Sequence, residues 1–215
     1  MAGSYRYLPD GDRKGELVDA TLDCISELGL HSTTVRAVAA KAGVSIGLIR
    51  HHFENKANLI FEAYSRTMHL ITASAHEVLT SKEGTPHQRL RQFVKVAIGG
   101  QSSDPRMFAL WATFISQVGI NPSIATYRKE LYINLRSATE NLLEELYAAE
   151  GVVKSREELE RLACVINAVL DGLWIEICLD ESGKSVDKLI NLALETIDML
   201  LGIQPIKTVG DCETS

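Results

Sequence analysis

Four basic side chains lie within one short stretch near the amino end of the chain. They are Arg36, Lys41, Arg50 and Lys56. With Glu54 as its one acid, the stretch 34–56 has four basic residues and one acidic residue, a net charge of +3, whereas the whole chain has a net charge of −6. A local positive patch on an acidic protein is suited to contacts with phosphate groups. Non-specific coating of nucleic acid is disfavoured, because it usually needs a broadly basic surface.

The residues around this patch predict two short helices joined by a tight turn. Apolar side chains recur at the helical spacings of three and four, at positions 35, 38, 39 and 42. Thr34 and Ser45 suit the N-caps of the two helices, because a hydroxyl oxygen can accept hydrogen bonds from the free amides of a first turn. Gly43 can adopt the left-handed conformation that ends a helix. This layout is typical of a helix-turn-helix motif.

The second of these helices is expected to have an inner apolar face and an outer polar face. The inner face consists of Leu48, Ile49 and Phe53, and the outer face of Ile46, Gly47, Arg50, His51 and His52. A helix that starts with small residues can enter the major groove and bring its first turns to the base edges. We expect the bases to be nearest to Ile46, Gly47 and Arg50. We expect phosphate contacts from Thr34, Arg36, Ser45, His51 and Lys56.

The stretch from Leu17 to Leu59 resembles the DNA-binding domain of the TetR family of bacterial regulators. The matching positions are Ala20, Gly29, Thr33, Thr34, Val35, Ala39, Ala42, Gly43, Val44, Ser45, Gly47, Ile49, His52, Phe53, Lys56 and Leu59. The resemblance implies a homodimeric repressor that binds double-stranded operator DNA and responds to a small molecule. At position 50 the family usually has an aromatic residue, so Arg50 departs from its pattern; this arginine could bind the DNA backbone or a guanine.

The carboxyl half is similar to one branch of that family, the choline-sensing BetI-type regulators of betaine synthesis. Two segments carry this resemblance, 107–143 and 168–182, and its most specific pieces are Asp171-Gly172-Leu173-Trp174 and the pair Trp111 and Phe114. It implies choline or a related cation as the effector, and control of choline or glycine betaine metabolism or transport. Relatives of this type need not sense choline, so an unrelated small molecule stays an alternative.

Aromatic side chains at helical spacing could form a cage for such a cation. Phe108, Trp111 and Phe114 recur every three residues on one predicted helix. Trp174 lies on another, with Asp171 one turn before it, and Tyr127 and Tyr132 lie on a helix between them. Each aromatic face contributes about 0.5–2 kcal/mol to binding a quaternary ammonium ion. The alternative is that these aromatic residues only fill the core.

Asp171 is the more informative member of this candidate ligand site. A carboxylate among Val169, Leu170 and Leu173 needs a partner. The partner could be a ligand cation, a backbone amide or an arginine of a second copy. His69 and His76 could also face a pocket, although packed or solvated histidines are the ordinary outcome.

The last two predicted helices, 155–180 and 185–202, are the expected dimer interface. The first is apolar around most of its circumference, which predicts burial on two sides, one by the core and one by a second copy. The alternative is a helix at the centre of a monomer. The expected interface residues are Leu170, Trp174, Ile177, Leu192 and Leu200.

The pattern as a whole predicts an all-α fold. No long stretch alternates with a period of two, and the further helices are expected at 13–29, 55–79, 87–100, 105–118 and 122–149. We expect a three-helix DNA-binding domain over 1–56, a helical ligand-binding and dimerisation domain over 57–203, and a flexible tail over 204–215.

Several other classes of protein are disfavoured. The chain lacks the common phosphate-loop, nucleophile-elbow and zinc-protease motifs, so we expect neither catalytic residues nor a cofactor or metal site. The most apolar segment, 162–179, contains Asn167, Asp171 and Glu176, which argues against a membrane span. The cysteines of the chain are widely spaced, which argues against a disulfide framework and favours a reducing cytoplasm. Cys24, Cys164 and Cys178 are expected in the core. A helical protein-interaction module without DNA binding stays open, although it would not need the clustered basic residues.

Overall fold

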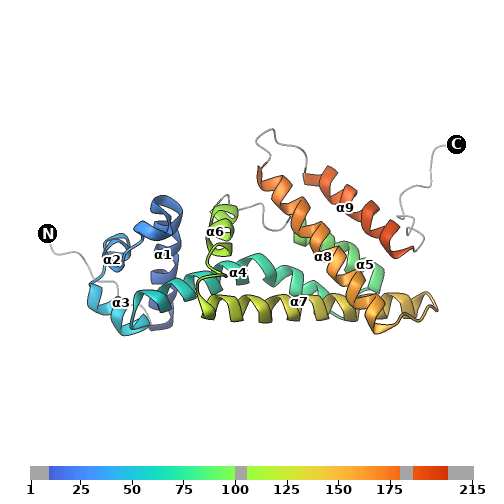
Figure 1. Cartoon of the computed structure of the whole chain (residues 1–215), viewed down its shortest axis with the longest axis horizontal. Coiled ribbons are helices and arrows are strands. Elements are labelled where there is room, and N and C mark those ends of the chain that lie inside the picture. Colours follow the sequence, from blue (N-terminus) through green and yellow to red (C-terminus); the bar gives the residue numbers. More distant parts are fainter. Residues whose placement is uncertain (1–9, 100–105, 180–185, 203–215) are drawn as a thin grey trace. The chain divides into compact units, whose positions relative to one another are not determined.

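A computed structural model of the chain describes residues 10–99, 106–179 and 186–202. Within these ranges all regular secondary structure is α-helical, which confirms the predicted fold class (Figure 1). The helices are α1 (Asp10–Ser32), α2 (Val35–Ala42), α3 (Ile46–Phe53), α4 (Lys56–Thr80), α5 (Pro86–Gly99), α6 (Arg106–Ile115), α7 (Pro122–Ala149), α8 (Arg156–Leu179) and α9 (Val186–Leu201). The predicted tail 204–215 lies outside the described residues.

The helix boundaries follow the predicted ones closely, with two differences. α6 ends at Ile115 instead of residue 118, because the chain forms hydrogen-bonded turns from Phe114 to Asn121. α1 continues to Ser32 through a kink at Gly29, whose φ of 77° suits a residue without a Cβ.

The chain forms two compact units. One comprises Arg106–Arg128 and the described residues of Met1–Leu70, and the other comprises the described residues of Ile71–Pro105 and Lys129–Ser215.

These compact units do not coincide with the functional division expected near residue 56, because α6 and the start of α7 group with the amino-terminal helices. The division into a DNA-binding domain and a ligand-binding domain therefore stays a prediction. In the first unit, α1 packs on α2 and α6, and α2 packs on α3. Its most completely buried side chains include Leu17, Val38, Ile49, Phe53, Leu59, Tyr64, Leu110 and Phe114.

The second unit is built around mutual contacts of α5, α8 and α9 (Figure 1). Its buried core includes Phe93, Val94, Ile98, Leu142, Leu143, Leu146, Ala163, Ile166 and Ile197. By length and composition α8 could cross a membrane. Core helices share these properties, and α8 packs against α5 and α9 in this unit.

Of the expected core cysteines, Cys24 is buried, but Cys164 is exposed and Cys178 half-buried, so the prediction was wrong for Cys164.

A buried arginine joins α5 to α7 in the second unit. Arg89 is 5% exposed, donates to the Ser81 carbonyl at 2.5 Å and pairs with the Glu145 carboxylate. Lys82 approaches the same carboxylate at 2.6 Å. The hydrogen bonds from Lys82 and Arg89 lower the pKa of Glu145. The sequence gives no signal for this cluster, because Glu145 lies 56 residues from Arg89 and 63 residues from Lys82.

A capping box fixes the start of α8. The Glu158 amide donates to the Ser155 hydroxyl at 3.3 Å, and the Ser155 amide and hydroxyl donate to the Glu158 carboxylate at 2.9 and 2.8 Å. These two hydrogen bonds, with a third from Lys154, lower the pKa of Glu158 from 4.5 to about 2. A carboxylate whose pKa is lowered by folding stabilises the fold at pH values above its unfolded pKa, and this contribution disappears as the pH falls toward the folded pKa.

Replacing Glu158 by glutamine is therefore expected to lower the melting temperature at neutral pH. The difference from the wild type should shrink as the pH falls from 4.5 toward 2, the interval between the unfolded and folded pKa of Glu158. Thermal denaturation monitored by circular dichroism, at neutral pH and between these two pH values, measures this difference in melting temperature. Glu157→Gln, on the same helical turn, is the matched control; an equal, pH-independent loss in both variants would contradict the assigned role.

Candidate nucleic-acid interface and ligand site

The turn between α2 and α3 has the local geometry that the sequence predicts. The Ala37 amide donates to the Thr34 hydroxyl at 3.1 Å, and the Leu48 amide donates to the Ser45 hydroxyl at 3.2 Å. Gly43 is left-handed, with φ 66° and ψ 35°. Its amide donates to the Ala40 carbonyl at 3.3 Å, and the Val44 amide donates to the Ala39 carbonyl at 3.0 Å, which together close α2. Each cap uses the hydroxyl as an acceptor, so its proton stays available to a phosphate.

The face of α3 opposite its buried residues is open to solvent. Ile49 and Phe53 are buried and Leu48 is half-buried. Gly47, Arg50 and His51 are exposed and Ile46 is half-buried. His52, also expected on the outer face, is half-buried like Ile46, and its ring lies near those of His51 and Phe53, with centroids 5.4 and 6.1 Å apart.

The basic side chains of the motif are exposed to solvent, but one of them is already paired with an acidic residue. Arg36, Arg50 and Lys56 are exposed. Lys41 donates to Glu27 of α1 at 2.5 Å, and this hydrogen bond raises the pKa of Lys41. Glu27 therefore neutralises part of the positive charge that the sequence places in the motif. Arg36, Arg50 and Lys56 are the cations best placed for phosphate or base contacts.

The connection from α3 to α4 is an unusually tight turn. Glu54 has φ 63° and ψ −51°, and the Asn55 amide donates to the Phe53 carbonyl at 2.6 Å, which makes a strained γ-turn. The Asn55 side chain then caps α4 by accepting from the Asn58 amide at 2.9 Å. The turn places Lys56 directly after the end of α3.

The aromatic residues expected to bind a ligand fall in two different units. Phe108, Trp111 and Phe114 lie on α6 in the first unit, and Trp174 lies on α8 in the second. The Phe108 and Trp111 rings stack with centroids 6.0 Å apart. Phe114 is completely buried and contacts the Tyr64 ring at 5.4 Å. A cage formed by the whole set stays a prediction.

Asp171 is exposed in this chain, and its carboxylate accepts from the Tyr132 hydroxyl at 3.2 Å. The carboxylate therefore has a tyrosine hydroxyl as a partner within its own chain, and a ligand cation at Asp171 stays a prediction. On the same helix Leu170 and Trp174 are buried. His69 and His76 are both exposed, and His69 lines a hollow that is described below.

The residues expected at a dimer interface differ in exposure. Leu170 and Trp174 are already buried by their own chain, which leaves 4% and 6% of their surface exposed. Ile177 is half-buried, whereas Leu192 and Leu200 are exposed. Further exposed apolar side chains on α8 and α9 are Val165, Leu179 and Met199. Within the described ranges no group of three or more potential metal-binding side chains occurs.

Two family models match the chain over most of its length. Residues 17–63 match the model described as bacterial regulatory proteins, tetR family. Residues 86–202 match the model described as BetI-type transcriptional repressor, C-terminal. The first matched range includes residues 17–59, which resemble the TetR DNA-binding domain, and the second includes 107–143 and 168–182, which resemble the BetI branch.

Individual proteins agree with the family models. The chain is 30% identical over 189 residues to the HTH-type transcriptional regulator BetI of Burkholderia thailandensis, covering 88% of this chain and 93% of the relative. A crystal structure of a candidate transcriptional regulator from Pseudomonas aeruginosa PAO1 superimposes with a TM-score of 0.77 at 29% identity, covering 91% of this chain and 93% of that one.

A second crystal structure shares the fold at lower identity. It is a candidate transcriptional regulator from Saccharomonospora viridis in complex with choline, with a TM-score of 0.71, 19% identity, and coverage of 88% of this chain and 97% of that one. At this identity the similarity concerns the fold alone. From the family models and the relatives together, the chain belongs to the TetR family of transcriptional regulators and carries a carboxyl-terminal domain of the BetI type.

Proposed function

We propose that this transcriptional regulator is a homodimeric repressor that releases operator DNA when it binds a small molecule. The observation that carries the proposal is the capped α2–turn–α3 motif, whose exposed face presents Arg36, Arg50 and His51. In each subunit the first turns of α3 enter a major groove, with Ile46, Gly47 and Arg50 nearest the bases. Thr34, Arg36, Ser45, His51 and Lys56 hold phosphates.

A second copy supplies the other half of the operator contact. The apolar residues exposed on α8 and α9 support this pairing, because a chain that exposes several large apolar side chains on adjoining helices can bury them against its own copy. The two recognition helices of a symmetric dimer read half-sites about 34–36 Å apart on one face of the duplex. Repression, cytoplasmic location and the absence of enzymatic chemistry belong to the same proposal.

The effector in this proposal is choline or a related cation. The BetI-named relatives and the choline complex of the Saccharomonospora viridis protein favour it. Phe108, Trp111 and Trp174 supply aromatic faces, and Asp171 supplies a carboxylate. Phe114, which the sequence also offers for this cage, is already covered by its own chain. An unrelated small molecule stays the alternative, because proteins with this type of carboxyl-terminal domain can differ in ligand. The proposal extends to control of choline or glycine betaine metabolism or transport.

The ligand acts through its different affinity for two conformations. A ligand that binds the DNA-free form more tightly than the DNA-bound form lowers DNA affinity by the same factor by which DNA lowers ligand affinity. α4 is a continuous helix that begins directly after the recognition motif, so it is the natural element to transmit such a change.

Selection from a pool of random DNA duplexes tests the proposed function. The full chain should enrich a two-fold symmetric sequence whose half-sites are about one helical turn apart. Recovery of no sequence, or of one half-site alone, would overturn a dimeric DNA-binding regulator. A matched selection with Arg50→Ala controls for retention that does not depend on α3.

Choline is expected to raise the melting temperature of the wild type and to raise it less in Trp111→Ala. Binding to the native state stabilises it according to ligand concentration, and removal of one aromatic face weakens binding by about 0.5–2 kcal/mol. Differential scanning fluorimetry measures both shifts. The neutral isostere 3,3-dimethylbutanol is the matched ligand control. A shift with the isostere equal to that with choline, or no shift with choline, would refute a cation cage and leave the DNA-binding proposal intact.

A further inference from the structure

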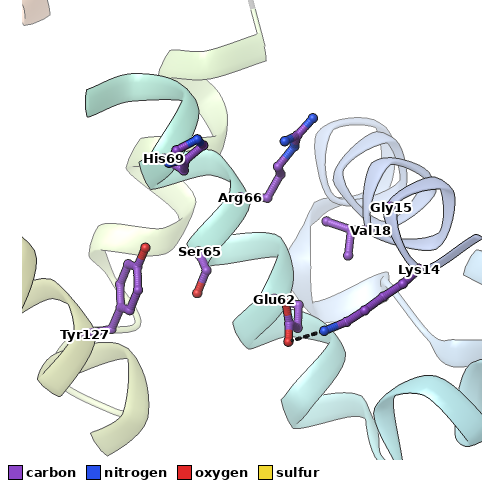
Figure 2. A pocket seen from close by; sticks show the side chains of 8 residues that line it. All are labelled: Lys14, Gly15, Val18, Glu62, Ser65, Arg66, His69 and Tyr127. Atoms are coloured by element: carbon purple, nitrogen blue, oxygen red, sulfur yellow. Dashed lines mark hydrogen bonds and ion pairs between the residues drawn. The ribbon is translucent and has the colours of Figure 1, made fainter. Parts of the chain in front are cut away.

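A polar hollow in the first unit is lined by Tyr127 but by none of Phe108, Trp111, Phe114 and Trp174. Figure 2 shows it between Lys14 of α1, the exposed side of α4 and Tyr127 at the start of α7. Its volume is about 430 Å³, within the range of small-molecule sites. The polar side chains that line it are Lys14, Glu62, Ser65, Arg66, His69 and Tyr127.

Most of these polar groups have no hydrogen-bond or ion-pair partner in the part of the chain that the structure describes. Among the residues that the structure describes, Arg66, His69 and the Tyr127 hydroxyl make no hydrogen bond or ion pair. The Ser65 hydroxyl oxygen is buried and also lacks a hydrogen-bond partner. Buried polar groups are nearly always hydrogen-bonded, so an unsatisfied hydroxyl at the wall of a hollow indicates a missing partner. One buried unsatisfied hydroxyl, together with the solvent-accessible polar groups of Arg66, His69 and Tyr127 around the same space, favours a ligand site.

The charges of the hollow select the kind of ligand. Two lining residues, Lys14 and Arg66, are cations, and the single carboxylate, Glu62, is already paired with Lys14 at 2.7 Å. A cationic ligand would have to displace Lys14 from Glu62. An anion instead meets the hydroxyls of Ser65 and Tyr127, and it meets the unpaired Arg66 guanidinium once this exposed side chain, directed away from both hydroxyls in Figure 2, turns into the hollow. Guanidinium groups bind planar oxyanions with two parallel hydrogen bonds.

We propose that this hollow binds a small organic anion, a carboxylate or a phosphate ester, through Arg66, Lys14 and the Ser65 and Tyr127 hydroxyls, and that its occupancy changes DNA affinity. The link to DNA is Lys14. Its ammonium group lies 5.8 Å from the ring centroid of Phe53, the last residue of α3. An anion that draws Lys14 from Glu62 changes this cation–π contact and the support of the recognition helix.

Isothermal titration calorimetry of the DNA-free full chain tests the site. The probes are succinate, inorganic phosphate and choline, each as the chloride or sodium salt at constant ionic strength. Saturable binding of succinate or phosphate is expected, and the comparison of these two probes distinguishes a carboxylate from a phosphate ligand. Arg66→Ala should raise the Kd by about tenfold or more, because it removes a charged hydrogen-bonding partner.

Two further variants test whether the anion binds to the side chains that line the hollow. Tyr127→Phe removes one hydroxyl and keeps the ring packing, so it should raise the Kd by a few fold. Arg136→Ala removes an exposed arginine of α7 outside the hollow and should leave the Kd unchanged. Absence of saturable anion binding, or binding that Arg66→Ala leaves unchanged, would overturn the site.

The proposed effect of the anion on DNA affinity is measured separately. With the DNA sequence that the wild type selects, the saturating anion should change the Kd for DNA by about threefold or more, and should not do so in Arg66→Ala. Unchanged DNA affinity in the presence of bound anion would overturn the regulatory role. Anion binding is measured without DNA, so its failure is distinct from a failure of the proposed repressor function, and the choline arm reports on the aromatic residues.

Discussion

Replacing Arg50 by alanine is expected to lower affinity for the selected operator by about 30-fold to 10⁴-fold. A side chain that contacts a base contributes about 1–3 kcal/mol, and a symmetric dimer loses two such contacts at once. Arg50 is exposed on α3, one turn after the Ser45 cap, so its removal leaves the packing of Ile49 and Phe53 intact. Fluorescence anisotropy with a labelled duplex measures the change.

The salt dependence separates base contacts from phosphate contacts. Lys56→Ala should weaken binding to all duplexes alike and reduce the slope of log K against log salt concentration by about two per dimer, one for each lost phosphate contact. Arg50→Ala should in addition lower discrimination against altered operator bases. The matched control is Arg136→Ala, an exposed arginine outside the motif. Unchanged affinity and slope in both test variants would refute the assigned interface.

Replacing Leu192 and Leu200 together by glutamate is expected to produce monomers that bind DNA about 10²–10⁴-fold more weakly. The two leucines are 47% and 39% exposed in the single chain, so the substitution adds charge without disturbing its core. Two linked half-sites gain affinity by about this factor over one, and the monomer loses that gain. Sedimentation equilibrium measures the association state, and anisotropy measures the DNA affinity.

A second double variant controls for the added charge. Ile133 and Val153 are 52% and 95% exposed and lie on α7 and in the loop after it, so their replacement by glutamate adds the same charge elsewhere. This control should stay dimeric. If the α9 variant remains a dimer of unchanged DNA affinity, the pairing surface lies on other elements.

Local features were predictable because their causes lie close together along the chain. Thr34 and Ser45 cap helices that start beside them, and each partner amide is three residues away. Gly43 ends α2 for the same kind of reason, since its conformation depends on its lack of a Cβ. Periodicity of apolar residues placed the long helices in the same way.

Side-chain environment was less predictable, because the immediate neighbours of a residue do not decide which helix covers it. Asp171 follows the buried Leu170, yet it is exposed and accepts from Tyr132, 39 residues away. Cys164 lies beside the buried Ala163 and is exposed. Adjacent residues on a helix point in directions about 100° apart, so the direction of the neighbouring helix decides which one is covered.

By itself, the sequence determined the helices, the capped turn, the basic stretch and the family, since each depends on residue types at fixed spacings. Tertiary structure alone decided that Glu27 partly neutralises Lys41, and that Lys14 meets Glu62 across 48 residues beside a polar hollow. The physical reason is that these interactions form between helices, and their partners are set by how α1, α2, α3 and α4 pack.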